Sequence, residues 1–115
     1  MSNIEVGDYL RIFGMITKVT AIDEDYIDVD NKELICIPKS SLKYTIYKHS
    51  KNIIDLIEVG DYVNGVKVAN CGKGVFVRRI VQLENNYVIT NVDDCKVRSI
   101  VTKEQFKSIE YKVGE

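Results

Sequence analysis

The densest group of chemically active side chains in the sequence is acidic. Five carboxylates, with no basic residue among them, lie in one short stretch: Asp23, Glu24, Asp25, Asp28 and Asp30. Clustered carboxylates can bind calcium, but an EF-hand loop beginning at Asp23 would need glycine at its sixth position and glutamate at its twelfth. Those positions hold Asp28 and Leu34. The stretch therefore predicts either the solvated face of a hairpin or an acidic contact surface for a basic protein partner.

Basic candidates lie in the second half of the chain, and they are Lys73, Arg78, Arg79, Lys96 and Arg98. Residues 51–115 carry a net charge of +1 (10 basic, 9 acidic), against -2 for residues 1–50 (6 basic, 8 acidic). In a strand expected at 74–83, alternation places Arg78 and Arg79 on opposite faces, so one of them points inward or toward a ligand. A guanidinium can bind phosphate or carboxylate, although on a sheet edge it more often only protects the edge.

A glycine-flanked lysine and a set of tyrosines are weaker candidates. Gly72-Lys73-Gly74 could present backbone N–H groups to an anion, but it lacks the strand-to-helix context of a phosphate-binding loop and predicts a hairpin turn. The chain has seven tyrosines and no tryptophan. Tyrosine rings can stack on bases, whereas packing explains Tyr9 and Tyr62 more simply because both recur in an internal repeat.

Cysteine and histidine predict neither a metal site nor a catalytic one. Cys36, Cys71 and Cys95 form no CxxC pair, and His49 is the single histidine. This set disfavours structural zinc. Cys36 is expected in the core as a small apolar residue, and His49 in a solvated linker. An enzyme would need a cysteine of depressed pKa beside a base, so we expect a protein without catalytic activity, metal or cofactor.

An internal repeat predicts the elements that position these side chains. Residues 4–10 (IEVGDYL) recur at 57–63 (IEVGDYV), and each copy is followed by a glycine and β-branched residues. Isoleucine and valine number 30, against 7 leucines and alanines, which favours strands. We therefore expect an all-β protein of two fused SH3-like five-stranded barrels with short one-turn helices. The repeats would span 1–50 and 51–115 and pack as one folding unit.

Period-two patterns and turn residues place the individual strands. In the first repeat they are expected at 8–13, 15–22, 26–30, 33–37 and 42–48, and in the second at 61–69, 74–83, 87–91, 95–101 and 108–113. Asn64-Gly65 suits a tight hairpin turn with positive φ. Ser50 can cap a helical turn whose Ile53, Ile54 and Ile57 face inward. Thr102 and Gln105 predict a capping box at a second short helix.

Two stretches of the sequence resemble a known group of proteins. They are NIIDLIEVGDYVNG (52–65) and SIVTKEQF (99–106). Together with neighbouring residues they resemble a family of small proteins encoded by phages and prophages of low-GC Gram-positive bacteria. The resemblance implies the cytoplasm of a bacterial host as the setting, and it assigns no catalytic or binding residue.

These observations favour a non-enzymatic phage accessory protein that binds a host protein, such as a component of antiphage defence. Of the candidate surfaces, the acidic face is the one favoured for contact with this host protein. One alternative is sequestration of a nucleotide-like small molecule by the basic residues. Another is nucleic-acid binding through the second half, which the net charge of -1 disfavours. No apolar run is long enough to span a membrane, so we expect a soluble protein without a membrane partner. The sequence leaves open whether the protein forms a homo-oligomer.

Overall fold

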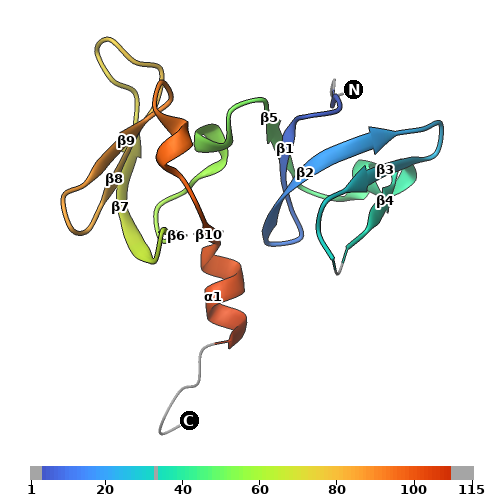
Figure 1. Ribbon diagram of the computed structural model, residues 1–115. Helices are drawn as coiled ribbons and strands as arrows, with labels where there is room; N and C mark the ends of the chain where they lie inside the picture. Colours follow the sequence, from blue (N-terminus) through green and yellow to red (C-terminus); the bar gives the residue numbers. More distant parts are fainter. Residues whose placement is uncertain (1–3, 33, 110–115) are drawn as a thin grey trace, which may run out of the picture. The chain divides into compact units, whose positions relative to one another are not determined.

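The computed structural model describes residues 4–32 and 34–109 (Figure 1). The chain divides into two compact units, Met1–Leu56 and Ile57–Glu115. Each unit is built on an antiparallel five-stranded sheet, which confirms the all-β class. The division differs from the expected one after residue 50 because the helical turn η2 (Ile53–Leu56) contacts β1 and β5 of the first unit.

The two sheets have the same topology. The first contains β1 (Tyr9–Ile12), β2 (Met15–Ile22), β3 (Tyr26–Val29), β4 (Cys36–Pro38) and β5 (Lys48–Ser50), in the order β4-β3-β2-β1-β5. The second contains β6 (Tyr62–Val63), β7 (Val66–Gly72), β8 (Ile80–Leu83), β9 (Val88–Thr90) and β10 (Ile100–Val101), in the order β10-β6-β7-β8-β9. In each unit the fifth strand therefore pairs with the first. The sequence repeat is a repeat of architecture, while the SH3-like barrel stays a prediction.

A bulge recurs at the same place in both sheets. The pairing of β2 with β3 shifts register between Val19 and Ala21, and the pairing of β7 with β8 shifts between Val68 and Asn70. A bulge bends its strand and increases the local twist. It lets one long strand pair with the first strand at one end and with the third strand at the other.

The repeated IEVGDY segment forms a turn that requires glycine and aspartate. Gly7 has φ +92° and Gly60 has φ +97°, in the left-handed region that side chains disfavour. Asp8 Oδ2 accepts the Glu5 N–H at 3.0 Å, and Asp61 Oδ2 accepts the Glu58 N–H at 2.8 Å. The two aspartates are buried. Burial of a carboxylate requires such partners, so these residues have a structural role.

A lysine completes the turn in each unit. Lys51 Nζ lies 3.1 Å from Glu5 Oε1 and 3.0 Å from Asp8 Oδ1. In the second unit Lys103 Nζ lies 2.9 Å from Glu58 Oε1, and the Lys103 N–H donates to Asp61 Oδ1 at 2.9 Å. The ion pairs tie the start of each unit to the segment that follows its fifth strand.

Alternating residues of the strands form the two cores. The core of the first unit consists of Leu10, Ile12, Val19, Ile27, Val29 and Ile37. In the second unit the buried strand residues are Val63, Val68, Val81, Leu83 and Ile89. Because Ile27 and Val29 face inward, the acidic residues between and beyond them face outward, as the period-two pattern predicted.

The hairpin signal at Asn64-Gly65 is confirmed, whereas Gly72-Lys73-Gly74 begins a longer loop and does not form the expected hairpin turn. Asn64 and Gly65 have φ +52° and +83°, so this turn divides the strand expected at 61–69 into β6 and β7. Of the three isoleucines expected to face inward, Ile54 in η2 and Ile57 just after it are fully buried, whereas Ile53 is only half-buried. The cap of η2 is Asn52 and not Ser50 as predicted, because Asn52 Oδ1 accepts the Ile54 N–H at 3.1 Å, while Ser50 ends β5 and its Oγ accepts the Asn52 N–H at 3.1 Å.

Several expected strands are wrong over part of their length. Residues 42–48 contain the end of the 3-10 helix η1 (Lys39–Tyr44), because Ser41 Oγ donates to Pro38 O and Thr45 Oγ1 donates to Ser41 O. Residues 74–79 form a loop before β8, and 95–101 contain the end of η3 (Asp94–Lys96) before the short β10. The α-helix α1 (Lys103–Ile109) overlaps the strand expected at 108–113, whose remainder lies outside the described residues.

The capping box at α1 is present as predicted. Gln105 N–H donates to Thr102 Oγ1 at 3.1 Å, and the Thr102 N–H donates to Gln105 Oε1 at 3.1 Å. Thr102 is fully buried. We expect Thr102→Ala to lower the free energy of unfolding by about 1–2 kcal/mol, because the helix loses one side-chain acceptor. Chemical denaturation measures this. Thr102→Ser, which keeps the hydroxyl, is the control, and an unchanged midpoint for Thr102→Ala would contradict the prediction.

Candidate functional site

The acidic residues lie on the β2–β3 hairpin, and two of them have roles in the fold. Asp23 Oδ1 accepts the N–H groups of Tyr26 (2.7 Å) and Asp25 (2.9 Å), and these bonds lower the pKa of Asp23. Asp30 Oδ1 accepts the Thr17 hydroxyl at 2.9 Å and the Lys18 N–H at 2.8 Å. Asp23 therefore closes the turn and Asp30 joins two strands.

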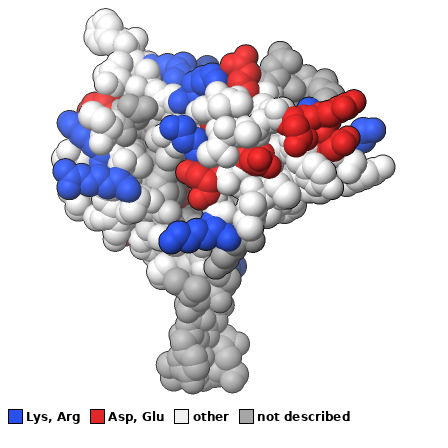
Figure 2. Space-filling view, turned by 45° about the vertical axis from the view of Figure 1, so that its right-hand side comes forward, with Lys and Arg blue, Asp and Glu red and all other residues white. Residues whose placement is uncertain are grey.

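The remaining acidic surface is smaller than the sequence indicated. Glu24 and Asp25 are exposed at the turn, and Asp28 is half-buried in β3. Figure 2 shows a group of acidic side chains at the right of the face that it draws.

The five basic candidates belong to two different segments of the second unit. Lys73, Arg78 and Arg79 lie in the loop of residues 73–79, between β7 and β8. Lys96 and Arg98 lie in and just after η3. They therefore form two groups that are separate in the sequence.

Arg79 holds the base of the loop of residues 73–79. Its Nη2 donates to Ile57 O at 2.6 Å, and its backbone N–H donates to Asn91 Oδ1 at 3.0 Å. Its Nε is buried and has no hydrogen-bond partner in the described part of the chain. Arg78 is exposed. The inward-pointing arginine of the pair is thus Arg79, which anchors the loop.

The tip of this loop is apolar and almost fully solvated. Val75 is 91% exposed and Phe76 is 97% exposed. Lys73 and Arg78, both exposed, flank them in the sequence. The Gly74 N–H donates to Val77 O at 3.0 Å, and a Cβ at Gly74 would lie 2.5 Å from Val77 Cγ2. The tip therefore depends on a tight turn that requires glycine.

The two loops with the strongest candidate residues are equivalent in the repeat. Residues 23–25 connect the second and third strands of the first unit, and residues 73–79 connect the second and third strands of the second unit. The first loop is short and acidic, whereas the second is longer and combines basic residues with an apolar tip. The copies share their turns and cores but differ in chemistry here.

The sequence analysis did not predict the exposed tip, because Val75, Phe76 and Val77 are β-branched or aromatic residues of the kind that usually form the interior of a strand. A comparison of the two repeats could have indicated that this segment is a loop. When the repeats are aligned on their buried strand residues, the segment 73–79 appears as an insertion relative to 23–25. An insertion in a repeat usually forms a surface loop.

Lys96 and Arg98 border a hollow of about 470 Å³, which is lined by Asn64, Tyr87, Lys96, Arg98 and Ser99. Lys96 Nζ lies 3.1 Å from Asp93 Oδ2 and 5.9 Å from the centre of the Tyr87 ring. Tyr87 is 46% exposed. The hollow thus combines an accessible aromatic ring with two cations.

Two expectations for cysteine and histidine are wrong. Cys36 is exposed, because Ile37 is the inward-facing residue of β4. His49 lies in β5, where its Nδ1 is 2.9 Å from Asp8 Oδ2, so it belongs to the buried turn instead of a linker. Burial raises the pKa of the Cys71 thiol, which is opposite to the shift that a nucleophilic cysteine needs.

The described residues contain no group of three or more histidine, cysteine, aspartate or glutamate side chains that could hold a metal ion. Among these same residues, no helix has the length and apolar character needed to cross a membrane. Comparisons with protein-family models, curated proteins and solved structures gave no match for the chain.

Proposed function

We propose that this protein acts by binding another protein, without catalysis, and that the loop of residues 73–79 is its principal contact. The observation that carries the proposal is the exposure of Phe76, at 97%, beside Val75 at 91%. Aromatic residues inserted into a pocket supply much of the binding energy in protein interfaces. A solvated phenylalanine on an anchored loop is suited to such an insertion.

The residues around the tip define the kind of partner. Lys73 and Arg78 are exposed on either side of the apolar pair. A complementary surface would have an apolar pocket bordered by carboxylates, since opposite charges speed association and exclude partners of the wrong charge. The resemblance to phage-encoded proteins supports a host protein as the partner.

The acidic turn that carries Glu24 and Asp25 is a second candidate contact for the protein partner. Glu24 and Asp25 are exposed, and Asp25 contributes its backbone N–H to the turn, which leaves its side chain facing solvent. A basic partner, as expected from the sequence, would use these two residues. The same binding experiment separates the two loops.

The test uses capture from host lysate followed by binding rates for the purified partner. We expect Phe76→Ser to weaken binding at least tenfold, about 1.4 kcal/mol, without changing the melting temperature. Ile46→Ser is the matched control, because Ile46 is 96% exposed in the first unit. Reversal of Lys73 and Arg78 to glutamate should mainly slow association.

Two outcomes would overturn the assignment of the loop. The first is equal binding by wild type and Phe76→Ser. The second is loss of binding only when Glu24 and Asp25 are replaced by lysine, which would move the contact to the acidic turn. Asp23 is left unchanged in that variant because it closes the turn. Capture of lipid vesicles in place of a protein would contradict the proposal itself.

A further inference from the structure

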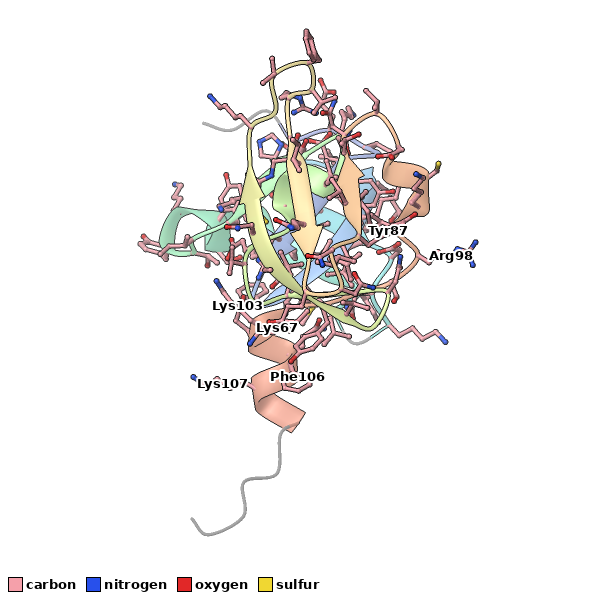
Figure 3. The ribbon with its side chains drawn as sticks, turned by 90° about the vertical axis from the view of Figure 1, so that its left-hand side faces the viewer. Lys67, Tyr87, Arg98, Lys103, Phe106 and Lys107 are labelled. Atoms are coloured by element: carbon pink, nitrogen blue, oxygen red, sulfur yellow. The ribbon has the colours of Figure 1, made fainter. Side chains whose placement is uncertain are left out.

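The hollow beside Tyr87 is independent of the loop at 73–79 and has a different chemistry. Its walls come from the β6–β7 turn (Asn64), from the segment between β8 and β9 (Tyr87) and from residues 96–99. Figure 3 shows Tyr87 and Arg98 on the same side of the unit, with the Arg98 side chain extending outward, while Lys107 extends from α1 on the opposite side. A volume of about 470 Å³ falls within the usual range of small-molecule pockets.

Asn64 fixes the wall that carries the two cations. Its Nδ2 donates to Lys96 O at 2.9 Å, and its Oδ1 accepts the N–H groups of Arg98 (2.8 Å) and Ser99 (3.1 Å). The Asn64 N–H also donates to Ser99 O at 2.9 Å. One side chain thus holds three successive peptide groups, so the hollow is preorganised although it is built from loops.

The side chains facing the hollow offer stacking and positive charge. The Tyr87 ring is accessible, and Lys96 lies toward its face while bonded to Asp93. Hydrogen bonding to Asp93 raises the pKa of Lys96, so this ammonium stays charged at neutral pH. Arg98 is exposed, and its guanidinium has no partner among the described residues. An accessible aromatic ring and an exposed guanidinium that line the same hollow match a planar base attached to a phosphate, which the long Arg98 side chain can reach from the rim.

We propose that this hollow binds a nucleotide, with the base stacked on Tyr87 and the phosphate held by Arg98 and Lys96. The ligand is either a free nucleotide or one nucleotide of a single strand, since both present the same base and phosphate. The proposal uses none of the residues assigned to the protein contact. Its failure would therefore leave the function of the loop at 73–79 untouched.

The test is a titration of the ¹⁵N-labelled full chain with adenosine monophosphate, followed by NMR. We expect shifts of the amide signals of Tyr87, Arg98 and Ser99, and saturation at millimolar concentration. Tyr87→Leu should weaken binding more than about fivefold, because stacking on the ring is lost, whereas Tyr87→Phe should retain it. Arg98→Gln should weaken binding similarly, and Lys107→Ala is the matched control.

A second arm distinguishes the two sources of the ligand. A hexamer of deoxyadenosine that binds more tightly than the monophosphate and releases with salt indicates a single strand. Equal affinity per site indicates a free nucleotide. The proposal is overturned if about 10 mM monophosphate shifts none of these signals. It is also overturned if inorganic phosphate alone gives the same shifts and Tyr87→Leu binds like wild type.

Discussion

A fragment of residues 1–50 will remain unfolded, whereas a fragment of residues 1–58 will fold and unfold cooperatively, in contrast to the single folding unit that the repeat predicted. The difference is η2, which the shorter fragment lacks. Ile54 and Leu56 are 0% and 2% exposed, so their removal uncovers the faces of β1 and β5 that they pack on. Removal also breaks the bond from Arg11 Nη1 to Leu56 O, which is 2.9 Å long, and leaves a buried guanidinium with fewer partners.

Amide NMR spectra and thermal unfolding of the two fragments measure this difference. We expect a dispersed spectrum and a single transition only for residues 1–58, since a domain of this size is marginal and cannot lose part of its core. Ile54→Asp in the longer fragment is the control and should abolish the transition. A cooperative transition in residues 1–50 would show that η2 is dispensable.

The second large effect is expected at Asp8. Asp8→Ala should lower the free energy of unfolding of the first unit by about 2–4 kcal/mol. The buried carboxylate accepts the Glu5 N–H, contacts Lys51 Nζ at 3.0 Å and lies 2.9 Å from His49 Nδ1. Its removal leaves several donors unpaired. Chemical denaturation measures the loss, and the exposed Asp25→Ala should change stability by less than about 0.5 kcal/mol.

Asp8 also makes the free energy of unfolding of the first unit depend on pH. Burial acts to raise the pKa of this carboxyl, but hydrogen bonds from Glu5, Lys51 and His49 outweigh burial and lower the pKa below its ordinary value. The folded chain therefore binds this proton less readily than the unfolded chain. The stabilisation is complete above the ordinary aspartate pKa of about 3.9 and is lost as pH falls through the lowered value.

Asp8→Asn separates the charge from the shape of the side chain. We expect this variant to be less stable than wild type at pH 7 and to lose less stability between neutral pH and about pH 3. Denaturation midpoints across this range provide the measurement. Parallel pH profiles for the two proteins would contradict an electrostatic role for Asp8.

The sequence determined the features of this protein that depend on neighbouring residues. The Asn64-Gly65 turn follows from the low cost of positive φ at these two residue types. The capping box of Thr102 and Gln105 follows from a spacing of three residues within one helical turn. The repeated IEVGDY segment predicted one architecture in two copies, because equal local sequences form equal turns and strands.

Only the tertiary structure decided which side chains became exposed and which distant ones met. His49 and Asp8 are far apart in the sequence, and the pairing of β5 with β1 brings them within 2.9 Å. The β-branched and aromatic residues around Val75 and Phe76 favoured a strand, but no described strand pairs with them, and they form a loop anchored by Arg79. The hollow beside Tyr87 depends on Asn64 bonding to residues 96–99. Local preferences extend over a few residues, whereas these contacts join segments that only the completed sheets bring together.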